Sequence, residues 1–123
     1  MDCFSTSYVK LQEAYFSESN AVGSWVMIGY KAPSSGAGDS TSSTGTNFAY
    51  SQQGTYTNGT ITTTTTATAV WQAKNTVVLN DCAVSNDNVW QVKATISNAL
   101  VTFDASTSNN CKPLTPTFDK IGK

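Results

Sequence analysis

The apolar residues near the start of the chain recur with the spacing of an α-helix. Between residues 4 and 20 they stand four, three and four positions apart, at Phe4, Tyr8, Leu11 and Tyr15. A period of 3.6 residues places them on one side of a helix, and the polar side then carries Lys10, Gln12, Glu13 and Glu18. We therefore predict an amphipathic helix over residues 4–20. A helix this short is marginal in water, so its apolar stripe must be packed on another element.

Residues 21–47 are predicted to connect this helix to a sheet. Residues 22–30 contain the apolar run Trp25 to Ile28 between Gly23 and Gly29, which favours an extended crossing segment. Residues 32–46 are rich in serine, glycine and threonine, which is typical of a surface loop.

Residues 48–105 carry the patterns of antiparallel strands. Residues 48–52 predict a short strand, residues 59–71 a long one and residues 77–84 another. In the long strand Ile61, Ala67, Ala69 and Trp71 share the face that we expect to point inward, and the even-numbered threonines share the other. Its many β-branched residues favour a strand over a helix.

A hairpin over residues 89–104 has the clearest pattern. With Ser97 and Asn98 as a two-residue turn, three apolar pairs fall on one face together with Trp90: Ile96 with Ala99, Ala94 with Val101, and Val92 with Phe103. A slip of one residue would place these side chains on the opposite face, so we expect this register. Residues 106–123 form a tail, whose prolines at 113 and 116 exclude it from a central strand.

The charge and composition exclude several classes of function. The net charge is −1, and all seven basic residues are lysines, so the sequence lacks the basic patch of a nucleic-acid binder. Histidine is absent, which removes the usual general base and metal ligand. We therefore expect a protein that is not an enzyme and that uses no cofactor. The 123 residues suffice for a single domain with its own core.

The three cysteines indicate a disulfide. Cys82 and Cys111 flank a loop-rich segment, and Cys3 lies far away in the sequence. The simplest pairing joins Cys82 to Cys111 and leaves Cys3 free or intermolecular. A metal site is disfavoured because the chain has neither a CxxC motif nor a histidine. A disulfide and a polar, weakly charged surface both favour a location outside the cell.

Other residues allow sharper interpretations. Asp81 and Asp87 could supply calcium ligands, but they lack the loop spacing of an EF-hand, so we predict no metal site. The three tryptophans could form a platform for sugars, although the pattern places Trp71 and Trp90 on core faces and Trp25 in an apolar run. Asn58-Gly59-Thr60 is an acceptor pattern for N-linked glycosylation.

The order of elements resembles the globular head of a type IV pilin or type II secretion pseudopilin. In such a head a helix is followed by a serine- and glycine-rich loop, an antiparallel meander and a disulfide-closed C-terminal loop. The sequence YVKLQEAYFSE of residues 8–18, followed by GSWVMIGY of residues 23–30, resembles the end of the long pilin helix and the entry to its loop. Cys82 and Cys111 stand where pilins place the pair that closes the C-terminal region.

This resemblance implies an α+β fold in which the helix packs on the sheet. Its stripe would pack against core residues of the sheet that include Trp71, Trp90, Val92 and Phe103. The hydrophobic half of a pilin helix is absent from this sequence, so we interpret the chain as a soluble, monomeric head. The full-length protein would be anchored in the inner membrane by that missing segment before it assembles with its own copies into an extracellular filament. The filament would serve attachment, motility or secretion, on a host or polysaccharide surface. The alternative function is a secreted carbohydrate-binding β domain.

Overall fold

The computed structural model describes residues 2–30, 42–44, 48–62, 67–79, 82–85, 88–97, 100–115 and 118, and for residues 2–6 and 42–44 it describes the backbone alone. The elements follow one another as α1 (Asp2–Ser19), β1 (Val22–Gly23), α2 (Trp25–Ile28), β2 (Ser42–Thr44), β3 (Phe48–Gln52), β4 (Thr60–Ile61), β5 (Thr68–Asn75), β6 (Val89–Ser97), β7 (Leu100–Thr107) and the 3₁₀ turn η1 (Lys112–Leu114). The fold is α+β, as the sequence predicts.

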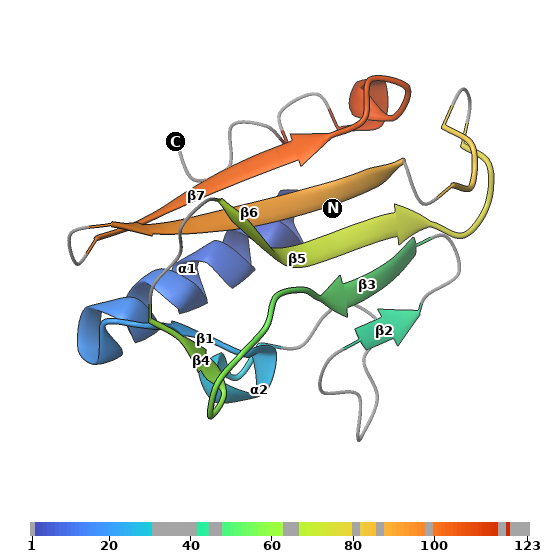
Figure 1. Cartoon of the computed structure of the whole chain (residues 1–123). Coiled ribbons are helices and arrows are strands. Elements are labelled where there is room, and N and C mark those ends of the chain that lie inside the picture. Colours follow the sequence, from blue (N-terminus) through green and yellow to red (C-terminus); the bar gives the residue numbers. More distant parts are fainter. Residues whose placement is uncertain are drawn as a thin grey trace.

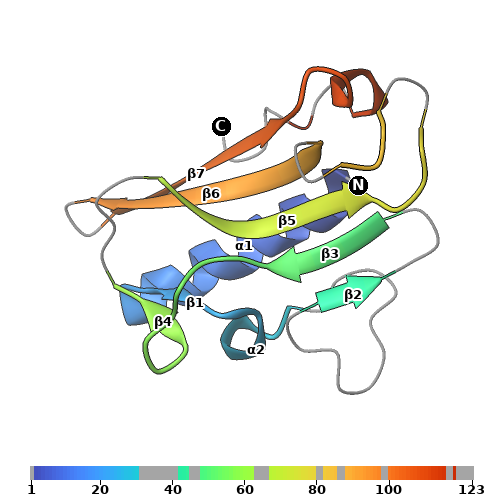
Figure 2. The ribbon, with the colours of Figure 1, turned by 45° about the vertical axis from the view of Figure 1, so that its right-hand side comes forward.

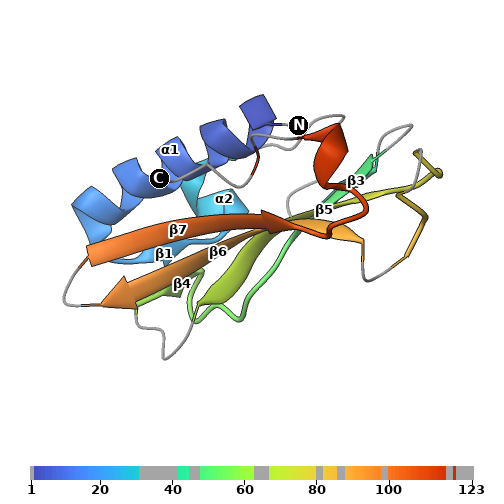
Figure 3. The same ribbon diagram turned by 90° about the horizontal axis from the view of Figure 1, so that it is seen from above.

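The strands form two antiparallel sheets in the part of the chain that the structure describes. The larger one has five strands in the order β2-β3-β5-β6-β7, and the smaller one pairs β1 with β4 (Figure 1). The small sheet lies with α2 beside one end of the large sheet (Figure 2). Seen from above, α1 and α2 both lie on one side of the large sheet, and α1 runs along it (Figure 3).

Helix α1 turns a different face inward from the one that the apolar spacing predicts. Its buried residues are Tyr8, Val9, Gln12 and Phe16, and they include the side chain of Gln12, which we assigned to the polar side. Leu11 was predicted to face the sheet but is 38% exposed. The buried face is rotated by roughly a quarter of a turn from the predicted face. The prediction counted apolar residues alone, and the polar Gln12 lies at the centre of the buried face.

The apolar run at residues 25–28 is a single helical turn, so the predicted extended segment is wrong there. The side chain of Ser24 accepts a hydrogen bond from Met27 N at 3.4 Å, and Gly29 ends the turn with a left-handed φ of 75°. Serine and glycine are favoured caps at these two ends, and they override the extended preference of Val26 and Ile28. Trp25 is buried, whereas Val26 and Met27 are exposed.

The predicted long strand at residues 59–71 is two strands that belong to different sheets. β4 pairs with β1, β5 pairs with β3 and β6, and residues 63–66 lie outside the described residues. The pairing of β5 with β6 shifts between Ala69 and Trp71, so Val70 is an extra residue. An extra residue reverses the alternation of faces, which is why Ala67 is exposed although it was predicted to point inward.

The described residues of the strand that we predicted over residues 77–84, which are 77–79 and 82–84, belong to no strand. β5 ends at Asn75, and Leu79 and Cys82 make only an isolated bridge. Val77, Val78 and Val84 are exposed. The buried Asn75 side chain donates hydrogen bonds to Val77 O and Cys82 O, so these two carbonyl groups are bonded to a side chain.

The hairpin of β6 and β7 has the predicted faces but not the predicted register. Ala94 pairs with Phe103 and Val92 with Ala105, and the last pair is Ser97 with Leu100. One strand is therefore displaced by two residues from our prediction. A shift of two keeps every side chain on its face because strands have a period of two, so the alternation could not separate the two registers.

The core lies between this sheet and the helices. Four residues of the sheet that the sequence assigned to the core are buried there: Trp71, Trp90, Val92 and Phe103. Trp25 is buried as well, so all three tryptophans have the core position that the sequence favoured.

Candidate functional site

A carbonyl at the irregular point of β5 receives hydrogen bonds from three parts of the chain. Val70 O accepts from Tyr8 Oη of α1 at 3.4 Å, from Trp25 Nε1 of α2 at 3.3 Å and from Gln53 N at 3.3 Å. The register shift leaves Val70 without a partner on β6. The irregularity therefore attaches both helices to the sheet at one residue.

Gln12 joins α1 to β1. Its Nε2 donates to Tyr8 Oη at 2.8 Å and to Gly23 O at 2.6 Å, and its Oε1 accepts from Gly23 N at 3.0 Å. The side chain is fully buried, so these bonds have no competition from water. A Cβ added at Gly23 would lie 3.0 Å from the ring of Tyr15, which shows why the strand comes so close to the helix only with glycine at this position.

The aromatic rings beside this contact form a cluster. The ring centroids of Tyr8 and Tyr30 are 5.1 Å apart and those of Trp25 and Tyr30 are 4.8 Å apart, both in edge-on arrangements. Trp71 Nε1 donates to Tyr30 Oη at 3.0 Å. These are favourable geometries for aromatic pairs, and the buried N–H group has a partner. We call the set Tyr8, Gln12, Gly23, Trp25 and Val70 the helix–sheet joint.

The predicted disulfide is present at the other end of the sheet. Cys82 and Cys111 are bonded, with their Cα atoms 4.7 Å apart and a separation of 29 positions in the sequence, and both are fully buried. Asn75 Nδ2 donates to Cys82 O and to Val77 O, both at 2.8 Å, and so holds the loop that carries Cys82.

The segment after Cys111 is tied to the sheet by two more contacts. Trp90 Nε1 donates to Thr115 Oγ1 at 2.6 Å. Phe118 is fully buried, with its ring centroid 6.0 Å from that of Trp71. Covalent bond, hydrogen bond and ring contact together fix the C-terminal segment against the sheet.

The structure brings together only some of the residues predicted from the sequence. Tyr8 belongs to the helix–sheet joint, Tyr15 is half-buried beside Gly23, and Leu11 faces outward. The side chain of Phe4 and the candidate calcium ligands Asp81 and Asp87 lie outside the described residues. Sequence reasoning missed Gln12 and Val70. A glycine within an apolar run, as at Gly23, was the available sign of a close approach.

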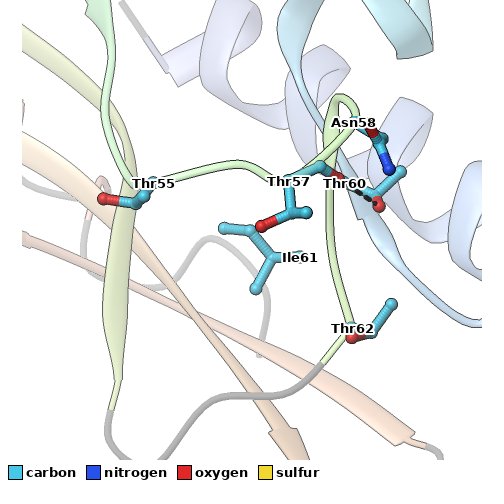
Figure 4. A pocket seen from close by; sticks show the side chains of 6 residues that line it. All are labelled: Thr55, Thr57, Asn58, Thr60, Ile61 and Thr62. Atoms are coloured by element: carbon cyan, nitrogen blue, oxygen red, sulfur yellow. Dashed lines mark hydrogen bonds between the residues drawn. The ribbon is translucent and has the colours of Figure 1, made fainter.

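Two depressions on the surface are lined by described residues. One, of about 380 Å³, lies around the turn before β4 (Figure 4), and four of its six lining residues are threonines: Thr55, Thr57, Asn58, Thr60, Ile61 and Thr62. The other, of about 280 Å³, lies between the end of α1 and the start of β7 and is lined by Glu13, Phe16, Ser17, Asn20, Leu100 and Val101. Both are open hollows on the surface.

Within the described residues, no three metal-ligating side chains of histidine, cysteine, aspartate or glutamate come together. Among the helices described, none combines the length and the apolar character needed to cross a bilayer.

Burial raises the pKa of several tyrosines. It raises the pKa of Tyr30 to about 12, although the hydrogen bond from Trp71 acts in the opposite direction. It also raises the pKa values of Tyr8, Tyr50 and Tyr56. In each case the cause is the loss of water around a phenolate, which disfavours the charged form.

These shifts predict that the fold weakens at high pH. In the unfolded chain the tyrosines ionise near pH 10, which is below their pKa values in the folded protein. Their contribution to the free energy of unfolding is therefore fully present below about pH 10 and is lost as the pH rises further. Each such group lowers the free energy of unfolding by at most about 1.4 kcal/mol per pH unit in that window. For Tyr30 the window ends at about pH 12.

Urea unfolding at a series of pH values measures this slope. Tyr30→Phe should make the slope shallower, since that variant has one fewer ionising phenol. A free energy of unfolding that stays constant above about pH 10 would contradict the prediction.

Comparisons of the chain with models of known protein families, with curated proteins and with solved structures found no match.

Proposed function

We propose that this chain is a structural subunit of a type IV pilus-like bacterial surface filament, in which it acts by polymerisation and carries out no catalysis. The observation that carries the proposal is the division of α1 into two faces. One face is buried at Tyr8, Gln12 and Phe16, with hydrogen bonds from Tyr8 to β5 and from Gln12 to β1, and the other faces solvent. A helix attached to its own head along one side leaves the other side for helices of neighbouring subunits.

The outer face of α1 has a composition that suits such packing. Ser7, Leu11, Ala14 and Glu18 are exposed and follow one another at helical spacing, so they form one stripe. Leu11 and Ala14 give this stripe an apolar centre. Small and apolar side chains there would let a second helix approach closely, in the manner of ridges and grooves in helical bundles. Leu11, which the sequence assigned to the sheet, thereby has a place in the proposed filament contact.

The disulfide-tied C-terminal segment supports the same proposal. Subunits of an extracellular filament must stay folded without cellular repair, and a disulfide resists unfolding in an oxidising environment. Cys82–Cys111, Trp90–Thr115 and Phe118 fix that segment to the sheet.

The alternative of a carbohydrate-binding domain needs exposed, coplanar aromatic rings. Trp25 is 2% exposed, and Trp71 and Trp90 are fully buried. The tryptophans that could have formed a sugar platform therefore belong to the core, and we do not propose that function.

A substitution at Leu11 tests the proposal in the source organism. Leu11→Arg places a charged side chain in the centre of the outer stripe, and we expect cells with this variant to lose the filaments that contain the chain, because burying an unpaired charge between helices costs several kcal/mol. Leu11→Met is the matched control, since it keeps an apolar side chain of similar volume, and it should retain filaments. Immunogold electron microscopy with an antibody against the chain measures the outcome.

Two observations separate failure to assemble from failure to fold. Thermal unfolding of the isolated Leu11→Arg chain should match that of the unaltered chain within about 0.5 kcal/mol, because the residue is exposed. The coding sequence upstream of this segment should encode about 25 apolar residues in a continuous helix. A catalytic domain in that place, or surface filaments that never bind the antibody, would contradict the proposal.

A further inference from the structure

The turn before β4 has an Asn-Gly pair at its tip. Thr57 N donates to Thr60 O at 2.9 Å, and Thr60 N donates to Thr57 O at 3.1 Å. The two residues between them both have positive φ, 54° at Asn58 and 80° at Gly59. This is the backbone of a two-residue hairpin turn of type I′, for which Asn-Gly is the preferred sequence.

The turn is attached to α2 on one side and open on the other. Gly59 O accepts a hydrogen bond from Ser24 N, the cap residue of α2, at 2.8 Å. A Cβ at Gly59 would lie 2.8 Å from Met27 Cγ, so the backbone itself fills this contact. Asn58 is exposed and lies at the tip of the turn (Figure 4).

We propose that Asn58 is a site of spontaneous deamidation that loosens the contact between this turn and α2. The backbone nitrogen of Gly59 attacks Cγ of Asn58, the new N–Cγ bond replaces the Cγ–Nδ2 bond, and Nδ2 leaves as ammonia with the proton lost from the Gly59 nitrogen. The product is a cyclic imide. One water molecule then opens the ring and gives either aspartate or isoaspartate. The reaction needs no oxidant, reductant or enzyme.

Two features favour deamidation at Asn58 over deamidation at the other asparagines. Gly59 has no side chain to hinder the attacking nitrogen, and Asn58-Gly59 is the sole Asn-Gly pair in the sequence. Ring closure also requires the two residues to leave the turn conformation. β4 and β1 pair over two residues each, so few hydrogen bonds oppose this local opening.

Isoaspartate alters the backbone of the turn, whereas aspartate only replaces the side-chain amide by a charged carboxylate. It inserts a methylene group into the main chain, and the two hydrogen bonds between Thr57 and Thr60 require the unmodified length. The bond from Ser24 N to Gly59 O depends on the same geometry. The modification therefore frees the N-terminal end of α2 and the small sheet beside it.

Incubation of the purified chain at mildly alkaline pH tests the proposal, with digestion and mass spectrometry used to follow each asparagine over time. Asn58 should convert about fivefold faster or more than the exposed Asn20, a factor that corresponds to the greater backbone freedom of glycine. Asn20 is a close comparison because it also has a left-handed φ, of 53°, and is followed by alanine. Conversion of Asn58 at or below the rate of Asn20 would overturn the proposal.

Matched variants show which asparagine releases the ammonia. Asn58→Gly keeps a sequence that suits the turn and should abolish the fast phase of ammonia release. Asn20→Gly suits a left-handed residue after a helix and should leave that phase unchanged. In the aged chain, amide hydrogen exchange at Ser24 should become faster than in fresh protein. Unchanged exchange in fully converted protein would refute the loosening of α2.

Discussion

Replacing Gln12 by leucine is expected to lower the free energy of unfolding by roughly 3–5 kcal/mol. The variant keeps a side chain of similar size but removes three hydrogen bonds in a fully buried place. Gly23 N and Gly23 O would lose the partner that Gln12 provides, and Tyr8 Oη would keep only its bond to Val70 O. An unsatisfied buried group costs about 1–3 kcal/mol. The gain from burying extra apolar surface offsets a part of this. Urea unfolding followed by tryptophan fluorescence measures the change.

Glu13→Leu is the control on the same helix. Glu13 is exposed, so this substitution should change the stability by no more than about 0.5 kcal/mol. A Gln12→Leu variant as stable as the original would show that the hydrogen bonds of Gln12 do not hold α1 to β1.

Removal of the disulfide has the second large expected effect. The double substitution Cys82→Ser and Cys111→Ser should cost about 3.5 kcal/mol, because the unfolded chain regains the entropy of a loop closed across 29 positions. For a domain of this size such a loss lowers the melting temperature by roughly 10–20 °C. Calorimetry of the variant and of the intact protein gives the difference.

Cys3→Ser distinguishes this bond from a general effect of losing thiols. The sequence leaves Cys3 outside the intramolecular pair, so that variant should have the same melting temperature as the unaltered chain. If Cys3→Ser lowered the melting temperature as much as the double substitution, Cys3 would have a covalent partner.

The sequence predicted the parts of the fold that depend on simple periodicity. The existence of α1, the short strand at residues 48–52 and the faces of the hairpin follow from spacings of 3.6 and two residues. The disulfide followed from the number and position of the cysteines. These features depend on neighbours along the chain, which a single sequence displays directly.

The parts that the sequence did not predict depend on contacts between distant residues. Gln12 is buried because Gly23 and Tyr8 satisfy its polar atoms, and nothing within α1 indicates that. The extra residue at Val70 becomes visible only when β5 and β6 are paired. The register of the hairpin was ambiguous for a related reason, since two registers of the same parity give identical faces.

The disulfide also determines how the chain would respond to tension. β6 and β7 lie wholly between Cys82 and Cys111, so a pull entering through α1 and leaving beyond Cys111 passes through the sulfur–sulfur bond and bypasses the hairpin. The enclosed residues, roughly 95 Å of extended chain, cannot lengthen while that bond is intact. β6 and β7 are thereby shielded from mechanical load, and stretching is confined to the segments outside the covalent ring.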